Sequence, residues 1–370
     1  MSTSSKSPRT ITDLEALGAS LPLDMRILFE RIYHVSTAEA ELRLPQAMVP
    51  WVERTFGPAA EVERQRIVRV ADLVTGEGTL FNGLRAKRPV RAVLRTDDNF
   101  TKELEDDAWA NPLETTPEDA FGRLSNAHGL TAANVAKYDA VHSIIVFREP
   151  DPLRFTAESI TAQLNLADQW LHVAHQQDPA ACYPYLMWNC LWRAGGSIVH
   201  GHIQASLARG RHYAKIERLR RDATAYHDAY GTSYFSDLAR VYGALGLRLD
   251  IAGLPVLAHL TPLKEKEVII LAEALDDRAA AAIFHVLRIF RDDLGVRSFN
   301  LGVLIPPIAP VVEPWDGFPV VIRIVDRGDL GARTSDMGGM EMFAESVVAF
   351  DPFTLHSALT GSPGGPSERG

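Results

Sequence analysis

The stretch NCLWRAGGSIVHGHIQ, from Asn189 to Gln204, carries the most structural information in this chain. Apolar and polar residues alternate over positions 199–207, a pattern that predicts a β-strand. His200, His202 and Gln204 would then project from one face of that strand, because successive side chains alternate between faces. Burying two imidazoles and an amide is costly unless they are hydrogen-bonded. This face therefore predicts a solvated pocket or a bound ligand.

The polar triplet is rarer than a chance pattern would be. With 12 histidines in 370 residues, about 0.4 His-x-His pairs are expected at random. A glutamine two residues further on lowers that expectation to below about 0.01. Imidazole suits attack on phosphorus, since one ring nitrogen is free near neutral pH while the other keeps its proton in a hydrogen bond. The alternative is a polar strand face that is hydrogen-bonded but not catalytic.

Two neighbouring features would help to bind a phosphate. The turn at residues 195–197, Gly-Gly-Ser, allows backbone N–H groups to approach a phosphate closely. The basic stretch RAKRP at residues 85–89 offers Arg85, Lys87 and Arg88, which would neutralise phosphate charge. A solvated basic loop is the other interpretation of that stretch.

Composition excludes several classes of protein. A chain of 370 residues that is 46% apolar suits one large or two modest domains. Its 38 basic and 47 acidic residues leave a net charge of -9, which disfavours nucleic-acid binding. No apolar run is long enough to cross a membrane, and the first residues lack the apolar core of a secretion signal. We therefore expect a soluble, cytoplasmic protein.

The two cysteines, Cys182 and Cys190, are too few for a disulfide framework or a four-thiolate metal site. Any zinc would need other ligands.

Strands alternate with single long helices along the chain. The first part predicts helices within 13–56, a hairpin at 66–82 and a helix that begins at Thr116. The middle predicts strands at 141–147, 183–192 and 199–207, with a helix at 156–176. The later part repeats this order loosely, with strands at 247–260, 267–272 and 318–326 and a helix at 276–294. We therefore expect an α+β fold of two related lobes, each an antiparallel sheet with a helix packed across it, fused into one compact body.

The predicted boundaries follow from composition. Residues 1–12 and 359–370 are rich in Ser, Gly and Pro, and we expect them to be disordered tails. The N-terminal lobe would occupy residues 13–210 and contain the His-x-His-x-Gln motif. The C-terminal lobe would occupy residues 211–358.

The central motif resembles that of a known family. A serine eight positions after an asparagine, followed by His-x-His-x-Gln, is similar to the active-site motif of the galactose-1-phosphate uridylyltransferase branch of the histidine-triad superfamily. The residues at that spacing here are Asn189, Ser197, His200, His202 and Gln204. The resemblance implies a fold of the histidine-triad type.

Two other segments extend the resemblance over roughly residues 66–357. LRAKRP at residues 84–89 is similar to the family's early basic motif, which implies that Arg85 and Arg88 approach the nucleotide. GGMEMFAES at residues 338–346 resembles the family's closing segment, which implies that Glu341 helps to bind a sugar.

The resemblance implies a ping-pong transfer of a nucleoside monophosphate, with UMP first among the candidates. His202 would be the nucleophile, and Gln204 and Ser197 would hold phosphoryl oxygens with the assistance of Asn189. His200 would orient its neighbours, contact phosphate directly or bind a structural ion. The donor would be a nucleotide sugar and the acceptor a sugar 1-phosphate or inorganic phosphate. The family's habit of pairing implies a homodimer.

Departures from the family pattern are also informative. Metal-containing members use an early Cys-x-x-Cys pair and a histidine after the strand at 141–147, where this chain has residues 148–152, REPDP. A second, iron-type site uses a His-x-His where this chain reads VVIRIVD, residues 320–326. We therefore expect neither metal and no cofactor. Ser335 and Met340 replace a lysine and a tyrosine beside the sugar-binding glutamate, so galactose 1-phosphate is not implied as the acceptor.

Other functions remain open at this point. Phosphorolysis of a nucleotide sugar or a dinucleoside polyphosphate would need inorganic phosphate as the acceptor. His142 precedes an apolar strand in the manner of diadenosine-polyphosphate phosphorylases, although we expect it to be a structural histidine. A nucleotide-binding regulator without turnover is a third reading. A hydrolytic metal held by His200 and His202 is a fourth, disfavoured because no carboxylate or third histidine is suitably spaced.

Overall fold

A computed structural model describes residues 9–88, 102, 104–105, 107, 109–332 and 337–361. Its main body is a nine-stranded sheet in which every pair of neighbouring strands is antiparallel. In spatial order its strands are β4 (Gly129–Ala133), β5 (Val141–Phe147), β7 (His202–Arg209), β6 (Ala181–Cys190), β11 (Phe299–Leu304), β12 (Val320–Asp326), β10 (Val268–Ala272), β9 (Leu254–Ala258) and β8 (Arg248–Ile251).

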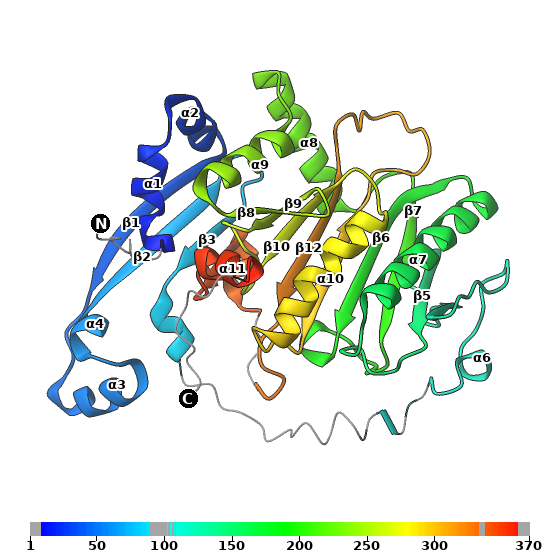
Figure 1. The fold of residues 1–370 in the computed structure, drawn as a ribbon, viewed down its shortest axis with the longest axis horizontal. Coiled ribbons are helices and arrows are strands. Elements are labelled where there is room, and N and C mark those ends of the chain that lie inside the picture. Colours follow the sequence, from blue (N-terminus) through cyan, green and yellow to red (C-terminus); the bar gives the residue numbers. More distant parts are fainter. Residues whose placement is uncertain are drawn as a thin grey trace, which may run out of the picture.

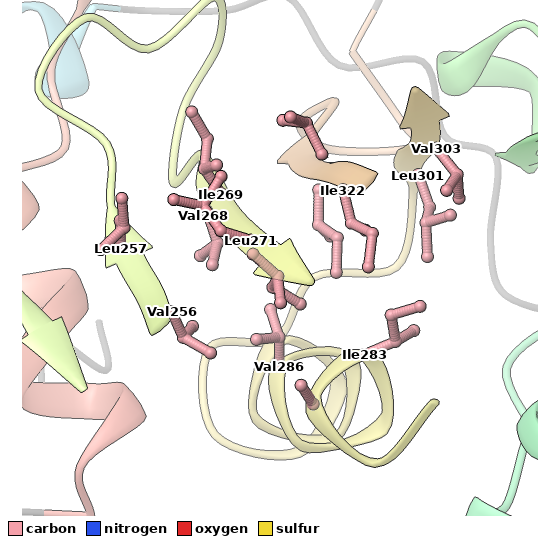
Figure 2. Packing of buried hydrophobic residues seen from close by; sticks show 14 of the residues in the cluster. Val256, Leu257, Val268, Ile269, Leu271, Ile283, Val286, Leu301, Val303 and Ile322 are labelled. Carbon is pink, nitrogen blue, oxygen red and sulfur yellow. The ribbon is translucent and has the colours of Figure 1, made fainter. Parts of the chain in front are cut away.

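Two long helices, α7 (Ala157–Gln177) and α10 (Asp277–Asp292), pack across this sheet (Figure 1). Each begins at a capping side chain, Thr156 for α7 and Asp276 for α10, which accepts hydrogen bonds from the first-turn N–H groups. Figure 2 shows Ile283 of α10 packed close to buried sheet residues. Both predicted helices are confirmed. They were predictable because their caps and apolar stripes are local signals.

The sheet contains the same unit twice. In the first half, the hairpin β4–β5 is followed by α7 and then by β6 and β7, with the spatial order β4-β5-β7-β6. In the second half, β9–β10 is followed by α10 and then by β11 and β12, with the order β9-β10-β12-β11. The two halves meet where β6 pairs with β11. The expected α+β fold of two related, fused lobes is confirmed.

A second sheet of four strands lies beside the first (Figure 1). Its strands, in order, are β1 (Tyr33–Glu41), β2 (Arg64–Asp72), β3 (Gly78–Phe81) and β13 (Glu345–Val348). The hairpin predicted at 66–82 is therefore confirmed. The prediction of helices within 13–56 is only partly right, since this segment also contains β1, which pairs with β2 along its full length. Pairing with a distant strand overrides weak local preference.

Further helices surround these two sheets. Those near the small sheet are α1 (Leu14–Ser20), α2 (Leu23–Ile32), α3 (Val49–Phe56) and α4 (Ala59–Glu63). The others are α6 (Pro112–Thr115), α8 (Ala214–Tyr230), α9 (Tyr234–Leu245) and α11 (Pro352–Leu359).

The helix predicted to begin at Thr116 is wrong, because α6 ends there. Asp119, an acid three residues after Thr116, fits the first turn of a helix in sequence. In the structure it accepts hydrogen bonds from the Ser143 hydroxyl and from Trp170 Nε1 at 2.8 Å. Its role is therefore set by distant partners and not by a helix start.

Residues 1–8 and 362–370, most of both predicted tails, lie outside the described residues. Within the first tail, Ile11 is buried and its N–H donates to Asp351 Oδ2 at 2.7 Å, so the packed structure includes this residue. Among the described residues, no helix combines the length and apolarity needed to cross a bilayer.

Candidate active site

The motif residues occupy one face of β7. Ile203, Ala205 and Leu207 belong to the core cluster that includes Trp170 of α7. His202 and Gln204 alternate with them and therefore face away from α7, as predicted. His200 lies just before the strand, since β7 begins at His202. We call this face of β7, together with the same face of β6, the motif face.

Glycine is required between the two histidines. A Cβ atom at Gly201 would lie 2.4 Å from Phe147 Cδ2, and no real carbon approaches so closely. The Gly201 N–H donates to Pro150 O at 2.9 Å, and its carbonyl accepts from Phe147 N at 2.9 Å. Gly201 therefore holds the end of β5 tightly against the start of β7. In the preceding turn, a Cβ at Gly196 would lie 2.8 Å from Asn189 O.

His202 has the geometry of a nucleophile. Its Nδ1 lies 2.8 Å from the carbonyl oxygen of His200, which can only accept, so Nδ1 carries the proton. Nε2 therefore keeps its lone pair. Burial lowers the pKa of His202, and a neighbouring charge on His200 acts in the same direction, so the ring is held neutral. The Trp109 ring lies edge-on to the His202 ring, with the two centroids 5.0 Å apart, and His202 is 7% exposed.

The side-chain amide of Gln204 is held through its oxygen. Its Oε1 accepts from the Tyr138 hydroxyl and lies 3.2 Å from His142 Nε2. His142 Nδ1 accepts from Tyr138 N at 3.2 Å, so its proton is on Nε2 and is donated to the glutamine. Because both donors contact the oxygen, the NH₂ group of Gln204 is turned toward a third partner. The buried His142 thus orients the amide, and burial lowers its pKa.

His200 is engaged through both ring nitrogens. Nδ1 lies 2.5 Å from Asp107 Oδ2, and Nε2 lies 2.7 Å from Phe147 O. Neither nitrogen is left for a phosphate or a metal ion. Of the roles left open for His200, these contacts favour the orienting one.

Asn189 lies at the junction of the two halves of the sheet. It pairs in register with Asn300 of β11, and Asn300 Nδ2 donates to Asn189 Oδ1 at 2.7 Å. Arg327 donates to the other end of the Asn300 amide. Extending the β6–β7 register by two residues sets Asn189 opposite His202, so the structure brings these two together. Ser197 is exposed in the turn between β6 and β7.

The predicted nucleotide-binding arginines lie elsewhere in the chain. Arg85 and Arg88 are exposed in and just after the 3₁₀ turn Gly83–Lys87, near Glu265. Partial burial and the charge of Arg88 lower the pKa of Arg85. Ala86 between them lines a cavity of about 1180 Å³. In Figure 1 this turn follows β3 at the left of the molecule, whereas β5 lies near the right end of the nine-stranded sheet.

Glu341 is also remote from the motif. It lies in the 3₁₀ turn Gly339–Phe343, accepts from Gly338 N at 2.8 Å and forms an ion pair with Lys264. Burial alone would raise the pKa of Glu341, but the bond to Lys264 lowers it. The carboxylate lines a cavity of about 350 Å³ between the two sheets. Met340 beside it is 38% exposed, and Ser335 lies outside the described residues.

Strand β12, where the resemblance would put an iron-type site, carries Arg323, whose guanidinium is paired with Glu267 and Glu77. A guanidinium has no lone pair to offer a metal ion. Across the described part of the chain, no three or more His, Cys, Asp or Glu side chains are grouped to hold a metal ion.

Sequence reasoning missed Asp107 and Trp109 and did not anticipate the role of Tyr138. The first two stand in the stretch DAWAN, residues 107–111, which has no periodicity or motif. Only the structure brings Asp107 to His200, 93 positions further along the chain.

Comparison with known proteins supports the fold. Neither a family model nor a curated protein matches the chain. An ADP-glucose phosphorylase from Arabidopsis thaliana, solved with bound ADP-glucose, has a TM-score of 0.58 at 14% identity, covering 78% of this chain and 96% of that one. A uridylyltransferase has a TM-score of 0.53 at 12% identity, covering 80% and 98%.

A GALT-like protein from Arabidopsis thaliana has a TM-score of 0.51 at 13% identity, covering 67% of this chain and 89% of that one. All three identities are low. The chain therefore has, at low sequence identity, the fold that this ADP-glucose phosphorylase, this uridylyltransferase and this GALT-like protein share with it.

Proposed function

We propose that this protein transfers a nucleoside monophosphate through a covalent bond to His202. One observation carries the proposal: the neutral His202 ring has an unprotonated Nε2 and shares a strand face with Gln204, whose amide oxygen is held by Tyr138 and His142. A nucleophile beside a neutral donor for phosphoryl oxygens is what such a transfer requires.

The first half-reaction would begin at the α-phosphorus of a nucleotide sugar. Nε2 of His202 forms a bond to phosphorus, the bond from phosphorus to the bridging oxygen breaks, and sugar 1-phosphate leaves with the electron pair. The positive charge that develops on the ring is stabilised by the Nδ1–H bond to the carbonyl of His200. Gln204 donates to a non-bridging oxygen, with Asn189 and Ser197 as further candidate donors.

In the second half-reaction an oxygen of the acceptor attacks the same phosphorus, the P–N bond breaks, and its electron pair returns to Nε2. The acceptor would be a sugar 1-phosphate or, as the alternative, inorganic phosphate. The similarity in fold to an ADP-glucose phosphorylase keeps phosphate in consideration. UMP is the nucleotidyl group to test first, followed by AMP and GMP.

We further propose that the protein works as a homodimer. Among the described parts of one chain, no hydrogen bond or ion pair joins Arg85, Arg88 or Glu341 to the motif residues. A nucleotide sugar that touches both sets would therefore span two chains, with the arginines on the nucleotide and the glutamate on the sugar.

Mass spectrometry at neutral pH tests the covalent step. The protein mixed with UDP-, ADP- or GDP-glucose should gain one nucleoside monophosphate on His202, and His202→Ala should gain none. His172→Ala, which removes a half-exposed histidine on α7, is the matched control and should react as the wild type does. Absence of an adduct with every donor would refute the proposal.

The acceptor follows from the second half-reaction. Adding glucose 1-phosphate or inorganic phosphate to the isolated adduct should remove the nucleoside monophosphate from His202. Faster removal by glucose 1-phosphate would indicate a transferase, and faster removal by phosphate a phosphorylase. Tight nucleotide binding in calorimetry without an adduct would instead support a regulator that lacks turnover.

A further inference from the structure

Asp107 is a buried acid with two defined contacts. Its side chain is 5% exposed, and Oδ2 lies 2.5 Å from Nδ1 of His200. Oδ1 accepts from Trp109 N at 2.9 Å, so both carboxylate oxygens are held. A buried carboxylate is retained only with such partners, and the His200 ring, itself 4% exposed, is the partner inside the protein.

His200 connects this carboxylate to the nucleophile. Its side chain spans from Asp107 to Phe147 O at the end of β5. Its backbone carbonyl accepts the Nδ1 proton of His202 at 2.8 Å. The ring of His200 therefore fixes the peptide whose oxygen selects the tautomer of His202. Without that oxygen in place, Nδ1 would lose its partner and the proton could move to Nε2, the atom that has to attack.

The contact is direct. A separation of 2.5 Å between Oδ2 and Nδ1 is a hydrogen bond, and it leaves no space for an ion between the two atoms. The Asp107 carboxylate contacts Nδ1 of His200 and the Phe147 carbonyl contacts Nε2, so the ring is held at both of its nitrogens. Such a chain of acceptor, imidazole and carbonyl fixes both the rotation of the ring and the position of its backbone.

We propose that Asp107 is a positioning residue for His202, acting through His200, and that it keeps Nε2 of His202 free of a proton and aimed at phosphorus. This inference rests on the proposed function. The competing reading is that Asp107 merely fastens residues 107–111, where Trp109 packs near Ile144 and Val146. The two readings differ in what happens to the ring of His202.

The test compares Asp107→Asn with wild type. Asparagine keeps an oxygen for Trp109 N but cannot serve as a charged acceptor for His200. We expect the rate of adduct formation at saturating nucleotide sugar to fall about 10- to 100-fold, as for other residues that orient a reacting group. The donor concentration at half-maximal rate should change less than about twofold, because Asp107 does not touch the substrate.

The control is Asp119→Asn. Asp119 is another buried acid of the same lobe; it accepts from Ser143 and Trp170 and pairs with Lys137, and it makes no hydrogen bond to His200 or His202. This variant should lose stability and keep the wild-type rate in the folded fraction. If Asp107→Asn does not fold, Asp107→Glu keeps the charge but displaces it by one methylene, and an intermediate rate is expected.

A second readout needs no substrate. Two-bond ¹H–¹⁵N spectra of protein labelled at histidine report which ring nitrogen is protonated, and the His202 signal is assigned from its loss in His202→Gln. The His202 ring of wild type should be protonated at Nδ1, and in Asp107→Asn a larger fraction of the His202 rings should be protonated at Nε2. If that share does not change, the inference is refuted, whether or not wild type forms an adduct. Absence of an adduct in wild type alone refutes only the proposed function.

Discussion

Gly201→Ala is the substitution that should damage the site most for the smallest chemical change. The new methyl group would lie 2.4 Å from Phe147 Cδ2 and 3.2 Å from Pro152 Cα. Phe147 has to retreat by about 1 Å to restore an ordinary contact. Its carbonyl holds the His200 ring at 2.7 Å, so the displacement is passed to His200 and to His202, whose Nδ1 bonds to the His200 carbonyl.

The expected losses follow from this displacement. Overpacking of a core contact costs about 1–3 kcal/mol of unfolding free energy. A shift of about 1 Å in reacting atoms costs about 100-fold in rate. Urea unfolding measures the first loss, and adduct formation on rapid mixing with the nucleotide sugar measures the second.

The matched control is Gly302→Ala. Gly302 lies in β11 of the same sheet, and a Cβ there meets nothing within 4 Å. This variant should keep the wild-type rate. If Gly201→Ala reacted as fast as Gly302→Ala, tight contact between β5 and the His-Gly-His segment would not matter for chemistry, and the packing argument would be wrong.

Three further outcomes are expected. Burial lowers the pKa of His202 below its ordinary value of 6.5, so the rate of adduct formation should fall by less than about half as the pH drops from 8 to 6.5 and should be lost only in more acid solution, as initial rates by mass spectrometry will show. Tyr138→Phe removes one donor to Gln204 and should slow the same step about 2- to 10-fold, the value of one hydrogen bond, while the midpoint of thermal unfolding stays unchanged. Burial raises the pKa of Asp72 from 3.8 to about 6, so this acid costs stability increasingly as the pH rises; in urea unfolding Asp72→Asn should gain about 1.4 kcal/mol relative to wild type between pH 5 and pH 8, and a constant difference would contradict the shift.

Local signals made the central parts of the fold predictable. The caps of α7 and α10 and the alternation along β7 lie within a few residues of the elements that they specify. The motif residues are predictable for the same reason, since His202 and Gln204 share a strand. β1 was not, because it is fixed by pairing with β2. The helix expected from Thr116 is absent, because Asp119 bonds instead to Ser143 and Trp170, far away in the sequence.

The surroundings of the motif depend on contacts between distant segments. Asp107 reaches His200 across 93 positions, and Tyr138 reaches Gln204 across 66. No periodicity marks such residues, because each is fixed by tertiary packing rather than by its neighbours in sequence. The placement of Arg85 and Glu341 away from the motif is likewise a property of the folded chain.

The parallel pairing of β13 with β3 has a consequence for how this protein is made. Gly78 in β3 pairs with Glu345 in β13, so the two partners emerge from the ribosome 267 residues apart. At a synthesis rate of about 5–20 residues per second, the edge of β3 in the β2–β3 hairpin stays unpaired for about 13–53 s before β13 has been made. During that interval the unpaired strand is open to association with other nascent chains. Chaperone dependence during translation should therefore centre on this small sheet.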